Sequence, residues 1–129
     1  MLRIMLLAIA LAWLVTGLYM LASPLEFYTV IPGLSMMGPF NSHFIRDVGL
    51  AFAASGTLTL WGLRKDSRDL TVAGALWPFL HALFHIQVWA HRGYPFDAIL
   101  AFDVVAVISP AFAAMAIAAR GVSFGKSST

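Results

Sequence analysis

The stretch LRIMLLAIALAWLVTGLYMLA, residues 2–22, decides the fold, because Arg3 is its only charged side chain. A helix needs about 20 apolar residues to cross roughly 30 Å of hydrocarbon. The run also exceeds the roughly 7–15 residues of a signal-peptide core, so we expect it to remain in the protein as a membrane span. Three later runs are of the same kind. The sequence therefore predicts four membrane-spanning helices, at residues 2–22, 43–63, 70–90 and 96–119.

The composition also indicates a membrane protein. Of the 129 residues, 60% are hydrophobic and 11% are charged, whereas soluble domains have about 25% charged residues. A soluble monomer of this size has too little interior to bury so much apolar surface. The runs do not alternate between polar and apolar residues, as the strands of a membrane barrel do. We therefore expect an all-α fold, with residues 1–129 forming a single four-transmembrane-helix bundle in the lipid bilayer.

Cysteine content and charge distribution exclude several functions. The chain has no cysteine, so it has no disulfide, thiolate metal site or cysteine nucleophile. Its eight lysines and arginines are scattered between apolar runs and form no basic stripe, so nucleic acid is not an expected partner. A chain this small, with an alanine-rich fourth span, is expected to form a homo-oligomer or to join a larger membrane complex.

The first connection, residues 23–42, is long and apolar. Its prolines and glycines allow no continuous helix, so we expect a long apolar loop on the outer side, over the mouth of the bundle or in the interface. Asn41 or Ser42 is the expected N-cap of the second span. Asp97 is expected at the start of the fourth.

The basic residues predict the orientation in the membrane. Cytoplasmic loops carry the excess of lysine and arginine. The second predicted face has only Arg92 in its loops, with Arg46 just inside the second span. We therefore expect both termini in the cytoplasm. Six basic residues lie on the predicted cytoplasmic face: Arg3, Arg64, Lys65, Arg68, Arg120 and Lys126.

Polar side chains inside the predicted spans are the candidate site. A charged residue costs about 2.5–3.5 kcal/mol at the centre of a membrane helix, so such residues usually face the interior and pair. At about 1.5 Å per residue, most of these side chains lie roughly 6–13 Å below the outer boundary, so all belong to the outer half of the membrane. The candidates are His43, Arg46, Asp47, His81, His85 and Asp103.

The spacing predicts which candidates share a face. His43 and Asp47 are four residues apart, and so are His81 and His85, so each pair lies on one side of its helix. Asp103 lies on a helix of small residues that permits close approach. We expect these five side chains to meet in one site between the second, third and fourth spans, with Arg46 as their charge partner.

Four uses of this cluster remain open. It could be structural, with ion pairs and hydrogen bonds between the helices. It could bind a divalent metal, because imidazole and carboxylate suit zinc, iron, copper and manganese. Haem is a weaker alternative, with His43 and His85 as the axial pair. A proton relay or a small-ligand pocket, for a quinone headgroup for instance, is the fourth. Whether the chain is an enzyme remains open as well. The expected metal ligands are His43, Asp47, His81 and His85.

Two motifs carry a resemblance to known proteins. The stretch GPFNSHFIRDVG, residues 38–49, and the stretch HALFH, residues 81–85, resemble a group of small four-span bacterial membrane proteins of uncharacterised function. More distantly, the chain is similar to the DoxX-like superfamily of four-helix membrane proteins. These resemblances imply a four-helix fold and a location in the bacterial inner membrane, and the DoxX-like one implies an association with quinone-linked redox chemistry in some members.

Overall fold

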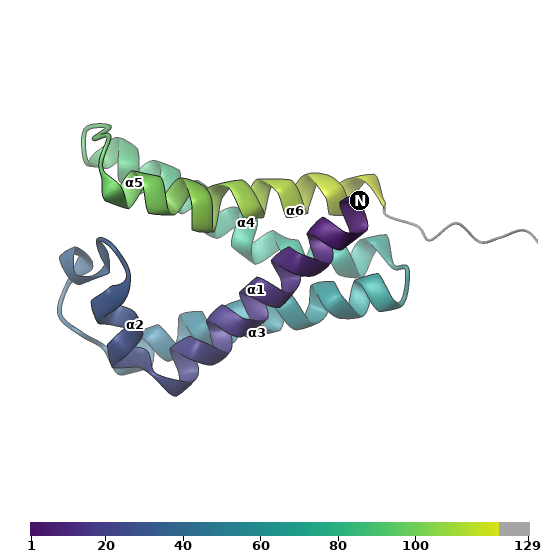
Figure 1. Ribbon diagram of the computed structural model, residues 1–129, viewed down its shortest axis with the longest axis horizontal. Helices are drawn as coiled ribbons and strands as arrows, with labels where there is room; N and C mark the ends of the chain where they lie inside the picture. Colours follow the sequence, from purple (N-terminus) through teal and green to yellow (C-terminus); the bar gives the residue numbers. More distant parts are fainter. Residues whose placement is uncertain (122–129) are drawn as a thin grey trace, which may run out of the picture.

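The computed structural model describes residues 1–121, and over that range all of its regular secondary structure is helical. Lys126, one of the six residues in the predicted cytoplasmic set, lies outside the described residues. Figure 1 shows the arrangement. The elements in chain order are α1 (Leu2–Ala22), α2 (Pro24–Val30), the 3-10 helix η1 (Leu34–Met37), α3 (Ser42–Arg64), α4 (Arg68–His91), α5 (Ala98–Phe102), the π-helical segment η2 (Asp103–Ile108) and α6 (Ser109–Arg120).

Three helices are long and apolar enough to cross a membrane, which supports the predicted class of protein. They are Leu2–Ala22, Arg68–His91 and Ala98–Arg120, the last formed by α5, η2 and α6 in one continuous run. The helix α3 has 23 residues, which matches them in length. It is not one of the three, because polar side chains near its start lower its mean hydropathy.

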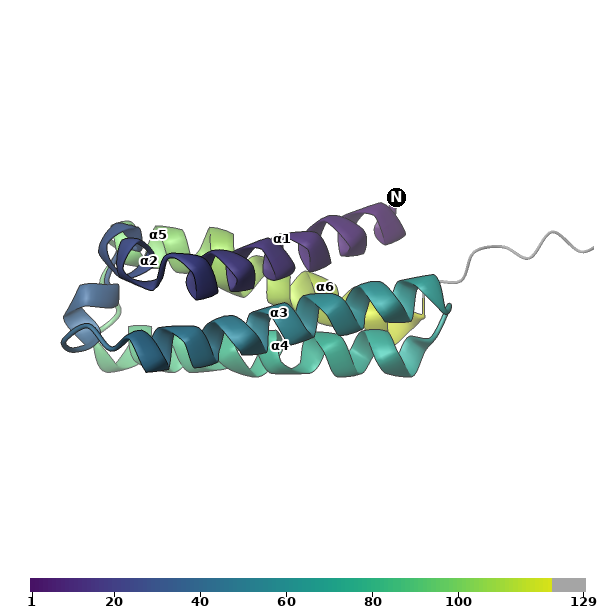
Figure 2. The same cartoon turned by 90° about the horizontal axis from the view of Figure 1, so that it is seen from below.

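The long helices pack in two pairs that converge at one end. Figures 1 and 2 show α1 crossing α3, and α4 running beside α6, with α3 also packed against α4. The helices meet at the end that holds the N-terminus, where Leu6 is fully buried and packs with Ala111, Ala114 and Ile117 in one apolar core. At the other end, which holds α2 and α5, the two pairs diverge.

Close approach of α1 and α3 depends on glycine. A Cβ atom built on Gly17 would lie 2.5 Å from both the Ala53 nitrogen and the Gly49 oxygen. On the other side of α3, a Cβ atom on Gly74 of α4 would collide with Thr59 and lie 3.0 Å from the Ser55 oxygen. Small residues at such crossings let helix backbones approach closely, which is how membrane helices gain packing energy. These contacts set the rotation of α3 about its own axis.

The segment between α1 and α3 is more ordered than a simple loop. Pro24 begins α2, where its missing N–H and fixed φ favour the first turn of a helix. Farther along, the Tyr28 hydroxyl donates to the Gly38 carbonyl at 2.7 Å, which ties the end of the segment to its beginning. No helix runs through the whole segment, as the prolines and glycines predicted.

Side-chain caps begin two of the long helices, at Asn41, one of the two predicted cap candidates, and at Asp97, which was predicted near the start of its helix. The Asn41 side chain accepts hydrogen bonds from the backbone N–H groups of His43 and Phe44, which satisfies two donors at the start of α3. Asp97 accepts from the Leu100 N–H at 2.9 Å and is paired with Arg92 in the preceding connection. The beginnings of the second and fourth predicted spans are therefore encoded locally.

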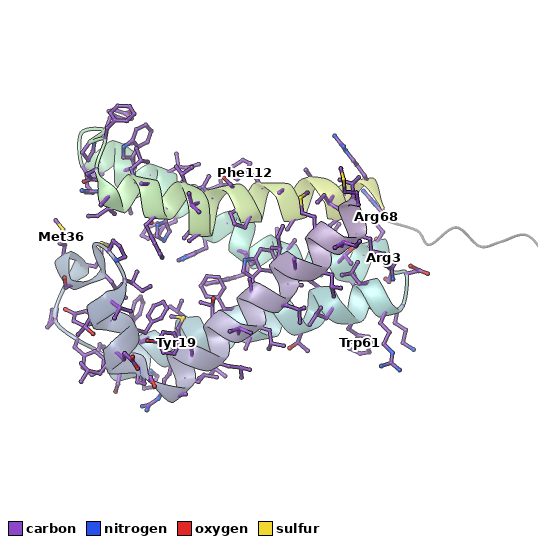
Figure 3. All side chains as sticks on the ribbon, viewed as in Figure 1. Arg3, Tyr19, Met36, Trp61, Arg68 and Phe112 are labelled. Carbon is purple, nitrogen blue, oxygen red and sulfur yellow. The ribbon has the colours of Figure 1, made fainter. Side chains whose placement is uncertain are left out.

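Arginines tie the helix ends together where the long helices converge. Arg3 pairs with Asp66 and donates to the Leu63 carbonyl, and Arg68 donates to the Ala119 carbonyl at 2.7 Å. Figure 3 shows Arg3 and Arg68 close to each other at this end. Cations next to the last carbonyls of a helix are stabilising because those groups carry partial negative charge.

Candidate functional site: a buried histidine–aspartate chain

Asp103 is the buried carboxylate of the candidate site. Its side chain is 8% exposed, and one of its oxygens lies 3.0 Å from the Nδ1 atom of His85 on α4. His85 in turn places its Nε2 atom 3.2 Å from the Nε2 atom of His81, one helical turn earlier. The three side chains form a continuous chain of hydrogen-bonding groups from η2 across to α4.

Aromatic rings close the far end of this chain. His81 stacks on Trp77, with ring centroids 4.8 Å apart and an interplanar angle of 12°. Phe52 of α3 meets both rings edge-on, at 5.0 Å from Trp77 and 5.7 Å from His81. The rings hold the imidazole of His81 in place and present apolar surface around it, so the chain ends against α3.

The local sequence explains why Asp103 is where it is. Pro110 has no N–H to return to the carbonyl of Ala106, so the regular α-helical pattern cannot continue through this turn. The turn before it widens into η2, in which the Ser109 N–H bonds to the Val104 carbonyl, five residues back. Wider turns of this kind recur at functional sites. In this chain the widened segment starts at Asp103 itself and packs against α4.

The geometry is compatible with two proton states that differ by one proton. In the first, Asp103 is ionised, His85 donates to it from Nδ1, and the Nε2–H of His81 donates to the bare Nε2 of His85. In the second, His85 carries protons on both nitrogens and donates from Nε2 to the bare Nε2 of His81. The 3.2 Å hydrogen bond between the two imidazoles can form in both states, and in the second state the 3.0 Å contact between His85 and Asp103 joins opposite charges. The net charge of the site changes from −1 to zero when the proton is taken up.

His43 and Asp47 form a separate pair. The His43 Nδ1 atom lies 2.8 Å from a carboxylate oxygen of Asp47, and the two side chains are 86% and 59% exposed. Phe52 marks the side of α3 that contacts the histidine chain. At about 100° per residue, Asp47 and His43 lie about 140° and 180° around the helix from it. They therefore point away from His81, His85 and Asp103.

Arg46 also lies outside the chain. Its Nε atom approaches the Leu21 carbonyl in the last turn of α1, at 3.4 Å. The single site predicted from the sequence thus divides. The structure brings together His81, His85 and Asp103, and it leaves His43, Arg46 and Asp47 on the outer surface of α3.

The predicted metal ligands divide in the same way. Among residues 1–121, no three histidine, aspartate or glutamate side chains lie close enough together to hold a metal ion. The two histidines suggested as axial haem ligands do not face each other. His43 lies on the exposed side of α3, whereas His85 lies on α4 beside Asp103. Two ligands, His81 and His85, remain side by side on α4.

Sequence reasoning missed Phe52. A signal was available, because α3 and α4 are joined by a turn of three residues and so must pack antiparallel. That register places residues near 52 beside residues near 80. Buried hydroxyls continue along the same seam, but each donates within its own helix, Thr59 to the Ser55 carbonyl and Thr71 to the Arg68 carbonyl, both at 2.8 Å. They do not extend the chain of side-chain hydrogen bonds.

Comparison with family models, with curated proteins and with solved structures found no match to this chain.

Proposed function

We propose that this chain is a multi-pass membrane protein that takes up and passes on a proton at the chain of Asp103, His85 and His81. The observation that carries the proposal is the 3.0 Å contact between the buried Asp103 carboxylate and His85, continued by the 3.2 Å contact between the two histidines. An isolated charge in a membrane is costly, and chains of aspartate and histidine are a common form of proton relay there.

The site would be electrically neutral after it takes up one proton, and this favours proton handling over a purely structural role. Uptake of one proton turns an ionised carboxylate beside neutral imidazoles into a neutral ion pair, and the hydrogen bond between the two imidazoles can form in both states. The hydroxyls of Thr59 and Thr71 donate to backbone carbonyls, so they do not prolong the relay toward the other face. The proposal is therefore a proton-handling site open to one side of the membrane, and not a transmembrane proton channel.

The proposed topology places this site in the outer half of a bacterial inner membrane. In this topology α3 crosses the membrane as well, which brings the number of spans to four. Its 23 residues and its packing between α1 and α4 support this assignment. The turn at residues 65–67 lies beside Arg3 and the end of α6, so the basic residues gather at the end where the helices converge. By the positive-inside rule this end is cytoplasmic.

We expect a reporter fused after Lys65 to read cytoplasmic, and one inserted after Gly93 to read periplasmic. Enzymatic reporters active on only one side of the membrane make this measurement, and the paired fusions control for expression level. The reverse result at both positions would move the histidine chain to the cytoplasmic half. A cytoplasmic reading at both positions would mean that α4 does not span.

The direct test of the proton site is nitrogen NMR of the protein labelled with 15N-histidine in lipid bilayers, recorded against pH. We expect the Nδ1 atom of His85 to stay protonated throughout, because Asp103 accepts from it. We expect the two histidines to take up one proton between them as the pH falls, with the tautomer of His81 changing at the same midpoint. Constant tautomers across the whole range would support the structural role, and two independent protonations would rule out a shared proton.

Metal binding is the second candidate function, and one distance favours it. Two nitrogen ligands of a tetrahedral zinc ion lie about 3.3 Å apart, given Zn–N bonds of about 2.0–2.1 Å. The Nε2 atoms of His81 and His85 are 3.2 Å apart, and Asp103 orients His85 from behind, as carboxylates do behind metal-bound histidines. Zinc added to the NMR sample decides between the two. Stoichiometric loss of proton uptake at both histidines favours the metal, and an unchanged titration favours the relay.

A further inference from the structure

One stripe of α3 is exposed along the length of the helix. It is charged in the first two turns, which lie in the outer half of the membrane in the proposed topology. Its members recur every three or four residues, and all are exposed in the structure. At about 100° per residue, they fall within an arc of about 80°. This α3 stripe comprises His43, Asp47, Leu50, Ala54, Thr57 and Trp61.

The stripe lies opposite the helices that α3 already packs against. Gly49 and Ala53 approach Gly17 of α1, and Phe52 contacts Trp77 and His81 of α4. Phe52 is about 180° around the helix from His43. Figure 3 shows Trp61 projecting from the side of α3 away from the other long helices. No described residue of the chain covers the stripe.

The exposed side of α1 provides a comparison within the same molecule. There the exposed positions from Ile4 to Leu18 are all aliphatic or methionine, as expected for a surface against lipid chains. The α3 stripe instead has a carboxylate that is 59% exposed, one turn inside the start of the helix, followed by the small residues Ala54 and Thr57. This carboxylate contacts only His43 of the same helix, at 2.8 Å, and lipid offers the exposed pair no further partner, whereas small and polar residues are typical of helix–helix contacts in membranes.

The stripe has groups of both signs, so the stripes of two copies of the chain can be complementary to each other. His43 can carry a positive charge and Asp47 a negative one, and they are one turn apart. Two copies inserted in the same orientation present their α3 helices in parallel, related by a two-fold axis along the membrane normal. In a parallel pair with contacts every 3.5 residues, each side chain packs beside the partner's residue of the same layer and against the partner's residues of the layers above and below. Each His43 is then placed beside Asp47 of the second copy, twice by symmetry.

We propose that a second copy of this chain docks on the α3 stripe, forming a parallel two-fold dimer in the membrane. The proposal concerns a surface away from Asp103 and does not depend on proton handling there. It explains why α3 is the least apolar of the long helices: its polar residues face another protein chain in place of lipid. Ala54, at the middle of the helix, lies closest to the two-fold axis.

The absence of cysteine from the sequence makes the test direct. Single variants Leu50→Cys, Ala54→Cys and Thr57→Cys are oxidised with molecular iodine in intact membranes, and disulfide-linked dimers are read on a denaturing gel. The matched controls are Leu11→Cys and Val15→Cys, which are exposed at a similar depth on α1. We expect the stripe positions to cross-link roughly tenfold faster than the controls, because a dimer raises their effective concentration.

Equal rates at stripe and control positions would overturn the proposal, because they would reflect random collisions. Ala54→Phe gives an independent measurement without a thiol. Counting of photobleaching steps for labelled protein in liposomes should show dimers for the unmodified chain and monomers for this variant. The control Ala12→Phe, on the exposed side of α1, should remain dimeric. Monomers for the unmodified chain, or cross-linking of the stripe only to a different protein, would rule out a second copy as the occupant.

Discussion

Replacement of Gly17 by valine should destabilise the protein by about 3 kcal/mol, the upper part of the range for overpacked interiors. The added Cβ atom would lie 2.5 Å from the backbone nitrogen of Ala53 and 2.5 Å from the backbone oxygen of Gly49. Both are backbone atoms of α3, so no side-chain rotation relieves the contact. The two helices must separate, and the packing along their whole crossing is weakened.

The measurement is the loss of helix packing in mixed micelles as denaturing detergent is added, followed by near-ultraviolet circular dichroism. Ala12→Val is the control, because it adds the same β-branched side chain at an exposed position of the same helix. We expect the control to unfold within about 0.5 kcal/mol of the unmodified protein. Equal destabilisation by the two variants would mean that the contact of Gly17 with α3 is not a determinant of the fold.

The second large effect is expected at the proton site, in the pair Asp103 and His85. Asp103→Leu should cost about 1–3 kcal/mol, because it removes the carboxylate that lies 3.0 Å from the partly buried His85 imidazole. The double variant Asp103→Leu with His85→Phe should recover most of this loss, since replacing both partners of a buried polar pair with apolar groups is often neutral or stabilising. The same double variant should take up no proton at the site.

This combination separates a structural role from a chemical one. Stability should recover in the double variant for either role, so proton uptake is the discriminating measurement. If the pair served only to hold η2 against α4, the unmodified protein would show no shared proton for the double variant to lose. If it handles a proton, the folded double variant is stable and inactive. Stability comes from the same detergent titration, and proton uptake from the pH dependence of the histidine nitrogen resonances. His91→Gln, a change at the exposed end of α4, is the control and should alter neither.

Most of the helix boundaries were predictable from the sequence. The expected runs at residues 2–22, 43–63, 70–90 and 96–119 correspond to α1, α3, α4 and the continuous segment from α5 to α6. Asn41 was one of the two predicted N-cap candidates of α3, and Asp97 was predicted at the start of the fourth span. These features depend on neighbouring residues along the chain, through hydropathy and local hydrogen bonds, so no tertiary information is needed.

The widened turn η2 was not predicted, although its signal was present. Pro110 lacks the N–H that would bond to the Ala106 carbonyl, and a kink is a common result of such a gap. The structure instead accommodates the missing bond by an i to i+5 pattern that starts at Asp103. Which of these two results occurs depends on how the helix packs against α4, so the residues of the turn alone do not decide it.

The sequence by itself determined the class of protein and its helices, because these follow from the length of the apolar runs. It also determined which polar residues pair along each helix, because side chains four residues apart share a face. It did not determine which pairs would face one another. The contacts of Gly17 with Gly49 and Ala53, and of Gly74 with Thr59, set the rotation of α3, and they join residues far apart in the chain. That rotation turned His43 and Asp47 outward and left His85 to meet Asp103. The depth of a residue in the membrane depends on its position along its own helix. The direction in which its side chain points depends on how that helix packs against its neighbours.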